Sequence, residues 1–365
     1  MRAAVAALGW PSDDLSDPSV LGPSATAEAV REAWLAATPG VDLTVVPFPD
    51  GGPTSADALA GVRAAVSPGV EGLRVGETLV LAPATGGRWD PVALADALVA
   101  LAVAGETATI AVPVGDADPA GDAAALWQAA ELGESVEPRG AADRRDGADR
   151  SGGAVAGLER LRAALAGLRV TVLTTSRRPL LGFQGMSAAT RDGREGDAAL
   201  AAAAQAQEER WTALARGGDA LAGAAGPGPA RSLIGPTRLS DQPGSGAAGG
   251  LAYALAAAGA RIVPAGPTLA RLTGLAEAAA AADLVAAVVP ALDSGELDER
   301  GVAVASSLAA ARGVPCVAAA GIVAVGRRDL MAGGVAGAHE GRPGLEGLAD
   351  QVRRLAHTWT PGTRE

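Results

Sequence analysis

A glycine-rich run from Gln242 to Leu251 holds the residues best suited to bind a charged group. It reads Gln-Pro-Gly-Ser-Gly-Ala-Ala-Gly-Gly-Leu and leads into an alanine-rich segment, 251–260, that predicts a helix. Glycine permits positive φ and close approach to the main chain, and a helix N-terminus favours anions. The run therefore suits a phosphate or carboxylate, although a tight turn that packs a helix onto a sheet explains it equally well. The candidate binding residues are Gly244, Ser245, Gly246, Gly249 and Gly250.

Two aspartates follow segments that read as buried strands. Asp50 precedes Gly51 and Gly52 after the expected strand 42–48, and Asp293 comes just after the expected strand 283–289. Ligands of open parallel sheets bind beyond the carboxyl ends of the strands. A carboxylate there could hold Mg²⁺ or accept a proton from a substrate hydroxyl. Each aspartate has an alternative role as the cap of the helix that follows it.

The spacing Gly244-x-Gly246-x-x-Gly249 also satisfies the letters of a dinucleotide-binding fingerprint. That fingerprint needs a strand directly before it and an acidic residue about twenty positions beyond it. The sequence predicts neither, so this run is a weak indication of an NAD site.

Short apolar strands alternate with helical patterns along most of the chain. This alternation is typical of βαβ units around a parallel sheet. The segment 133–153 is charged and rich in glycine, with no apolar period, and we expect a mobile loop there. The expected strands are 3–8, 42–48, 78–82, 108–113, 169–175, 283–289 and 315–320. The expected helices are 25–38, 54–66, 91–104, 120–132, 154–167, 196–216, 247–259, 267–281, 298–312 and 344–357.

The composition excludes several kinds of chemistry. The 365 residues include no lysine and no asparagine, so a Walker A phosphate loop and a lysine Schiff base are excluded. Cys316 is the only cysteine and there are two histidines, which argues against a Cys/His zinc site. The net charge of −11 argues against nonspecific binding to nucleic acid. No segment predicts a membrane span or a signal peptide, so we expect a cytoplasmic protein.

Several segments together resemble the bacterial glycerate kinase family, which phosphorylates D-glycerate with ATP. The run 243–251 is similar to the family's PGAGAAGGL motif, and 47–52 is similar to its PLADGG motif. The segments 282–285, 292–293 and 313–321 follow its ADLVITGEGRLD…HGVPVIALAG pattern without a gap. Pro179, Leu180, Gly182 and Gly185 resemble its DNPLxGxxG motif.

The chain departs from the family at positions that carry charge. The lysine of the family's SFKG motif corresponds to Leu21, and the glutamate and arginine of GEGRLD correspond to Val289 and Ala291. Arg300 falls where the family usually has a lysine, so the resemblance makes it the best candidate to neutralise phosphate charge. Asp122 falls in the counterpart of a Gly- and Asp-containing motif and is a candidate Mg²⁺ ligand.

The resemblance implies an α/β fold with two α/β domains. One, 1–132 plus 242–360, would be a flavodoxin-like, Rossmann-like parallel sheet built from both ends of the chain. The other would be a smaller middle domain, 133–241.

The implied function is ATP-dependent phosphorylation of a hydroxyl of D-glycerate or a related small hydroxy acid. ATP and Mg²⁺ are the implied cofactors. Asp50, Asp293 and Arg300 would be the catalytic residues, and Gly51 and Gly52 would join the glycine-rich run in binding. The expected partners are a glycerate-like molecule and a nucleotide, without nucleic acid or membrane, and a homodimer is one expected assembly. The alternative is a family member that has lost catalysis and acts as a ligand-binding or regulatory protein.

Overall fold

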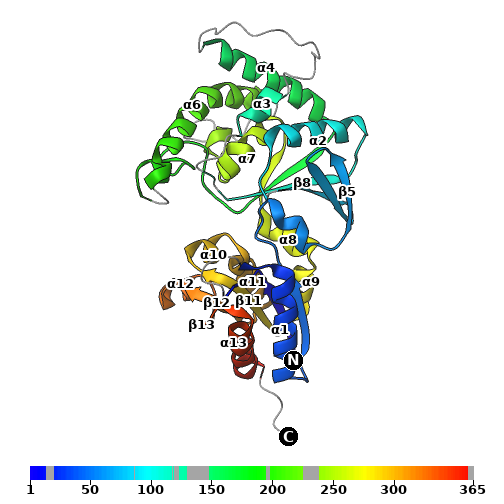
Figure 1. Ribbon diagram of the computed structural model, residues 1–365, viewed down its shortest axis with the longest axis vertical. Helices are drawn as coiled ribbons and strands as arrows, with labels where there is room; N and C mark the ends of the chain where they lie inside the picture. Colours follow the sequence, from blue (N-terminus) through cyan, green and yellow to red (C-terminus); the bar gives the residue numbers. More distant parts are fainter. Residues whose placement is uncertain are drawn as a thin grey trace. The chain divides into compact units, whose positions relative to one another are not determined.

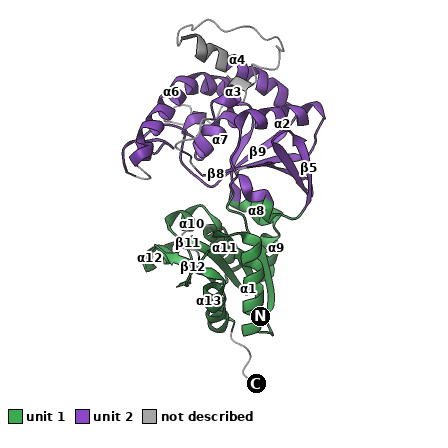
Figure 2. Ribbon diagram, viewed as in Figure 1, with its two compact units in different colours: residues 1–51, 57–60, 266–365 green, residues 52–56, 61–265 purple. Residues whose placement is uncertain are grey.

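The computed structural model (Figure 1) describes residues 1–13, 20–85, 87–116, 118, 123–129, 148–194, 198–224 and 238–360. It divides into two compact units, coloured separately in Figure 2. The first unit comprises residues 1–51, 57–60 and 266–365, and the second comprises 52–56 and 61–265. One unit is thus built from both ends of the chain. The division differs from the expected boundaries, because residues 61–132 and 242–265 belong to the second unit.

The first unit contains a five-stranded sheet in the order β13-β12-β11-β1-β4, and all its pairs are parallel. When only the strands of this sheet are numbered along the chain, the order is 2-1-3-4-5, which is the flavodoxin-like order. This topology confirms the expected α/β class. The strands are β1 (Arg2–Ala7), β4 (Asp42–Pro47), β11 (Leu284–Leu292), β12 (Cys316–Val323) and β13 (Gly337–Glu340). A separate antiparallel pair joins β2 (Trp10–Pro11) and β3 (Val20–Leu21).

Helices cover both faces of this sheet. One face packs against α1 (Pro23–Ala37) and α13 (Gly344–Trp359), and the other packs against α9 (Leu275–Ala281) and α11 (Gly301–Arg312). Alternate residues of β11 serve the two faces, so the strand is apolar throughout, as buried parallel strands are. The unit's other helices are α8 (Ala265–Leu272), α10 (Ser294–Asp298) and α12 (Arg327–Ala332).

The second unit contains a six-stranded mixed sheet in the order β10-β9-β8-β7-β6-β5. Strands β7 to β10 are parallel, and β5 and β6 form an antiparallel edge. The strands are β5 (Val62–Ser67), β6 (Val70–Val75), β7 (Thr78–Pro83), β8 (Thr109–Gly115), β9 (Arg169–Thr174) and β10 (Arg261–Pro264). The expected helix 54–66 is wrong, because only a 3₁₀ helix, η1 (Pro53–Ala58), precedes β5.

The core of the second unit is organised around three aromatic side chains from different helices. Trp127, Trp211 and Tyr253 contact one another with ring centroids 5.5 to 5.9 Å apart, and each is almost completely buried. The helices are α2 (Pro91–Val103), α3 (Ala125–Ala129), α4 (Ala148–Leu165), α5 (Ala188–Arg191), α6 (Ala201–Ala224) and α7 (Ala247–Ala257), with 3₁₀ turns η3 (Ala198–Leu200) and η4 (Leu239–Asp241).

Most of the expected mobile loop 133–153 lies outside the described residues, and α4 already begins at Ala148. Among the described residues, no helix is long and apolar enough to cross a membrane.

Candidate functional site

The topology of the first unit marks one place where a ligand is expected. In a flavodoxin-like sheet, the order in which strands are added reverses between strands 1 and 3, and ligands bind outside the carboxyl ends of the strands at that point. In this chain those strands are β1 and β11. Asp293 is the first residue beyond β11, and Asp50 follows β4, which pairs with β1 on its other side. The structure therefore places both predicted aspartates at the same edge of one sheet.

Arg300 lies beside Asp293 at this edge. Its Nη1 is 3.9 Å from Asp293 Oδ2, and both side chains are partly exposed. Gly295 makes room for the pair, since a Cβ there would lie 3.3 Å from Asp293 Oδ1 and from Arg300 Cζ. A carboxylate and a guanidinium thus meet at the expected ligand-binding edge.

Asp293 also performs the structural role that the sequence left open. Its Oδ1 accepts a hydrogen bond of 2.9 Å from the Glu296 N–H and caps α10. Capping uses one oxygen, and the ion pair with Arg300 involves the other. The cap fixes the direction of the carboxylate, which a reactive group also needs.

Glu296 is a further titratable group at this edge that the sequence analysis missed. The side chain is only 8% exposed, and its Oε2 accepts a hydrogen bond of 3.2 Å from the Val302 N–H in the first turn of α11. Burial raises the pKa of Glu296 to about 7, although that hydrogen bond and the charge of Arg300 act in the opposite direction. A carboxyl group with a pKa near neutrality can exchange protons at physiological pH. Its spacing from Asp293 was visible in the sequence, but its burial was not.

The chain passes from the first unit to the second between Gly51 and Gly52. Both glycines are buried. Gly51 has φ +88°, a left-handed conformation that favours glycine, and the Gly52 carbonyl accepts a hydrogen bond of 2.6 Å from Ser55 Oγ. These features explain the two glycines by turn geometry, and a binding role for them remains a prediction.

The glycine-rich run belongs to the second unit, at the carboxyl ends of β8 and β9. The Ala248 N–H donates to the Asp116 carbonyl (2.8 Å), and the Gly246 N–H donates to the Arg178 carbonyl (3.0 Å). Asp116 follows β8, and Arg178 lies shortly after β9. The structure thus brings together three segments that the resemblance had singled out separately.

Close packing explains the small residues of this run. A Cβ on Gly244 would lie 2.7 Å from Thr174 Oγ1, and one on Gly246 would lie 2.6 Å from the Pro179 carbonyl oxygen. Gly250 has φ +89°, and a Cβ there would lie 2.5 Å from Trp211. The expected turn that packs a helix onto a sheet is therefore present, and the anion site remains a prediction.

Ser245 is fully buried and ties the run to its neighbours. Its Oγ accepts a hydrogen bond of 2.9 Å from the Leu180 N–H and donates one of 3.1 Å to the Ser240 carbonyl. The Gly249 carbonyl accepts a bond of 3.0 Å from Trp211 Nε1. Ala248, Gly249 and Gly250 are all left-handed, so regular helix begins only at Leu251. The element directly before the run is a 3₁₀ turn, η4, and not the strand that a dinucleotide fingerprint needs.

Asp122 lies outside the described residues. Within the described part of the chain, no three His, Cys, Asp or Glu side chains are grouped so as to hold a metal ion. Mg²⁺ in phosphate-transfer sites is held by one or two carboxylates together with substrate phosphates and water. The aspartates at the edge of the first sheet fit that mode better than they fit an all-protein metal site.

The glycerate kinase family model matches residues 98–360, which is more than two thirds of the chain. The chain belongs to the glycerate kinase family. It is also similar to a crystal structure described as "putative glycerate kinase 2 from Salmonella typhimurium LT2", with a TM-score of 0.56 and 20% sequence identity. The match covers 98% of this chain and 96% of that one, and it shows a shared fold. No relative was found among the curated proteins.

Proposed function

We propose that this member of the glycerate kinase family phosphorylates a hydroxyl of D-glycerate or of a related small hydroxy acid, with ATP as the phosphate donor and Mg²⁺ as the metal. The observation that carries the proposal is the Asp293–Arg300 pair at the carboxyl end of β11, in a chain whose family is established. The reaction moves the terminal phosphoryl group of ATP to the hydroxyl oxygen, releases ADP, and leaves the hydroxyl proton to a base.

Each residue has a role in this proposal that matches its surroundings. Asp293 or Asp50 accepts the hydroxyl proton or contributes one carboxylate to Mg²⁺, which when bound shields the phosphate charge. Arg300 stabilises the charge that develops on the transferred group, a task that the family's missing arginine and lysine would otherwise share. The Asp293 cap and the Arg300 contact hold both groups at the strand end.

The glycine-rich edge of the second unit supports the same proposal by a separate argument. Its residues lie at the carboxyl ends of β8 and β9, where α/β sheets bind ligands. We infer that this edge contributes to binding a phosphate or carboxylate group of a substrate.

The test is an ADP-release assay with ATP, Mg²⁺ and D-glycerate on the full chain. Arg300→Ala should lower kcat/KM about 100- to 1,000-fold if Arg300 stabilises the transition state. Arg312→Ala is the matched control, since Arg312 is an exposed arginine at the opposite end of the same helix, α11. Its activity should stay close to that of the wild type.

Two outcomes would contradict the proposal. If the folded protein releases no ADP in response to D-glycerate or similar hydroxy acids, it is not this kinase. Binding of ATP without turnover would then support the ligand-binding alternative. If Arg300→Ala retains full activity, another group neutralises the phosphate.

A further inference from the structure

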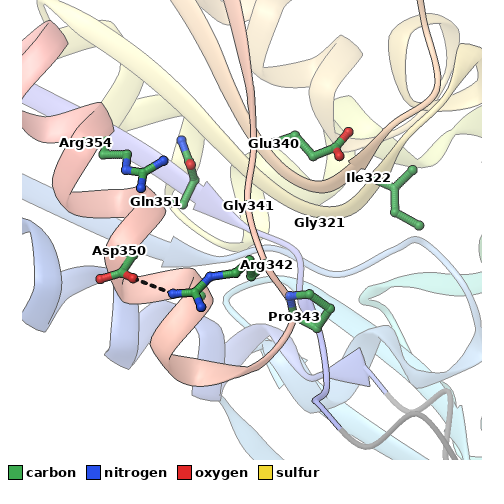
Figure 3. A pocket seen from close by; sticks show the side chains of 10 residues that line it. Gly321, Ile322, Glu340, Gly341, Arg342, Pro343, Asp350, Gln351 and Arg354 are labelled. Atoms are coloured by element: carbon green, nitrogen blue, oxygen red, sulfur yellow. Dashed lines mark hydrogen bonds and ion pairs between the residues drawn. The ribbon is translucent and has the colours of Figure 1, made fainter.

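A pocket of about 490 Å³ lies in the first unit at the carboxyl ends of β12 and β13 (Figure 3). Its walls come from these strand ends, from the loop after β13 and from α13. Of the lining residues, the sequence analysis named only Gly321, as the end of the segment 313–321. The polar and glycine residues that matter to the argument are Gly321, Glu340, Arg342, Asp350, Gln351 and Arg354.

Gln351 is the most informative residue of this pocket. It is only 4% exposed, yet its amide makes no hydrogen bond with any described residue. The only fully buried side-chain polar atom without a partner in the described structure is Ser67 Oγ. The amide atoms of Gln351 are therefore not fully buried, and they are accessible from the pocket that this residue lines. Because the amide is open to the pocket, a ligand or water there can form the hydrogen bonds that no described residue supplies.

Arg354 gives this part of the pocket its positive charge. It is one turn beyond Gln351 on α13, and Figure 3 shows the two side chains next to each other on the helix. Within the described part of the chain, the Arg354 guanidinium has no ion pair. An arginine that lines a pocket beside an unpaired amide offers several N–H donors in a small space, which suits an oxyanion.

The other charged groups of the pocket are already engaged. Asp350 forms ion pairs with two arginines: its Oδ2 lies 2.9 Å from Arg342 Nη2, and its Oδ1 lies 3.2 Å from Arg353 Nη1. Glu340 Oε2 accepts a hydrogen bond of 2.8 Å from the Val323 N–H, and Figure 3 shows its carboxylate directed toward Ile322 and away from Arg354. The net charge of the side chains next to Gln351 and Arg354 is therefore positive.

The backbone around the pocket is tightly fitted. A Cβ on Gly341 would lie 2.9 Å from both the Gln351 Cβ and Trp10, and one on Gly347 would lie 2.0 Å from the Arg342 carbonyl oxygen. That same carbonyl accepts a hydrogen bond of 3.0 Å from Trp10 Nε1. Gly347 also belongs to the first turn of α13, which has no side-chain cap and whose N–H groups favour negative charge.

We propose that this pocket binds a small molecule through an oxyanion group, a phosphate or a carboxylate, that contacts the Gln351 amide and the Arg354 guanidinium. The volume exceeds that of a bare phosphate ion, so the rest of the ligand extends along the pocket toward the first turn of α13. This inference does not depend on the proposed kinase activity.

Calorimetric titration of the full chain with inorganic phosphate, at constant ionic strength, tests the proposal. We expect saturable binding in the millimolar range, weakened roughly tenfold or more by Arg354→Gln and by Gln351→Leu. Arg328→Gln is the matched control, because Arg328 is an exposed arginine on α12 of the same unit and does not line the pocket. It should change the affinity less than about twofold.

Titrations with D-glycerate and with ATP distinguish the source of the oxyanion. Competition between either compound and phosphate, lost in Arg354→Gln, would identify the carboxylate or the nucleotide as the ligand. The proposal is overturned if none of the three compounds binds saturably, or if Arg328→Gln weakens binding as much as Arg354→Gln does. Because Arg354 is exposed, its replacement should not disturb folding. A protein that binds phosphate here but releases no ADP would contradict only the kinase.

Discussion

Replacing Glu296 with glutamine should remove one specific dependence of stability on pH. Burial raises the pKa of this carboxyl group from its ordinary value of 4.5 to about 7. The folded protein therefore holds a proton on Glu296 that the unfolded chain releases at a lower pH. As pH rises from about 4.5 through about 7, the wild type loses the stability that this proton provides.

The size of the effect follows from the two pKa values. At 1.36 kcal/mol per pH unit, a pKa raised from 4.5 to about 7 is equivalent to roughly 3 kcal/mol in total. Between pH 5 and pH 8 the wild type should lose most of that contribution, roughly 2 to 3 kcal/mol. Glutamine cannot titrate, and its side-chain oxygen can still accept the hydrogen bond from the Val302 N–H. Glu296→Gln should therefore become more stable than the wild type as pH rises.

Urea denaturation of both proteins at several pH values between 5 and 8 measures this difference. Subtracting one free energy of unfolding from the other removes the contribution of every other titrating group. Glu277→Gln serves as the control, because Glu277 is exposed on α9 and should leave the pH dependence unchanged. A difference between Glu296→Gln and wild type that stays constant with pH, or that changes in the opposite direction, would refute the reasoning.

The remaining predictions also concern stability. Gly250→Ala should cost roughly 2–5 kcal/mol, since it combines left-handed strain with a Cβ 2.5 Å from Trp211. Gly182 has φ +93° and open space around it, so Gly182→Ala should lose only the strain energy, about 1–2 kcal/mol. Equal melting temperatures for the two variants would contradict the packing argument. Burial lowers the pKa of His339, whose Nε2 accepts a hydrogen bond of 3.2 Å from Trp359 Nε1. The stability of the wild type should therefore fall as pH drops below about 6.5, and the stability of His339→Gln should fall less. The same dependence of melting temperature on pH in both proteins would contradict this prediction.

The sequence predicted the fold class because buried parallel strands leave a clear apolar pattern. The strands around Leu284–Leu292 and Cys316–Val323 are apolar on both faces, so their ends were predicted within a few residues. The segment Val62–Ser67 was mistaken for helix, because its exposed edge strand is rich in alanine and carries no alternating apolar pattern. Its strand conformation comes from pairing with β6, which is a tertiary effect.

The candidate site was only partly predictable, for a different reason. Asp50 and Asp293 could be placed at one edge because each follows a strand, and strand direction fixes where that end lies. Gln351 could not be found, since a glutamine on an amphipathic helix is usually exposed, and only the packing of α13 buries it. Glu296 escaped notice for the same reason. Whether a polar side chain is buried depends on the residues that pack around it, and the residue type alone does not show it.

The discontinuity of the first unit has a consequence for the order in which the chain can fold during synthesis. Strand β1 pairs with β11 about 280 residues later, and the Arg2 N–H donates to the Asp283 carboxylate across a separation of 281 residues. All of the second unit's long segment, 61–265, leaves the ribosome before β11 does. At 5–20 residues per second, the β1–β4 pair waits roughly 10 to 50 s for its central partner. During that interval the edge of β1 that later pairs with β11 can pair with other strands. Chaperone binding near the start of the chain should therefore increase the yield of folded protein more than chaperone binding to later segments.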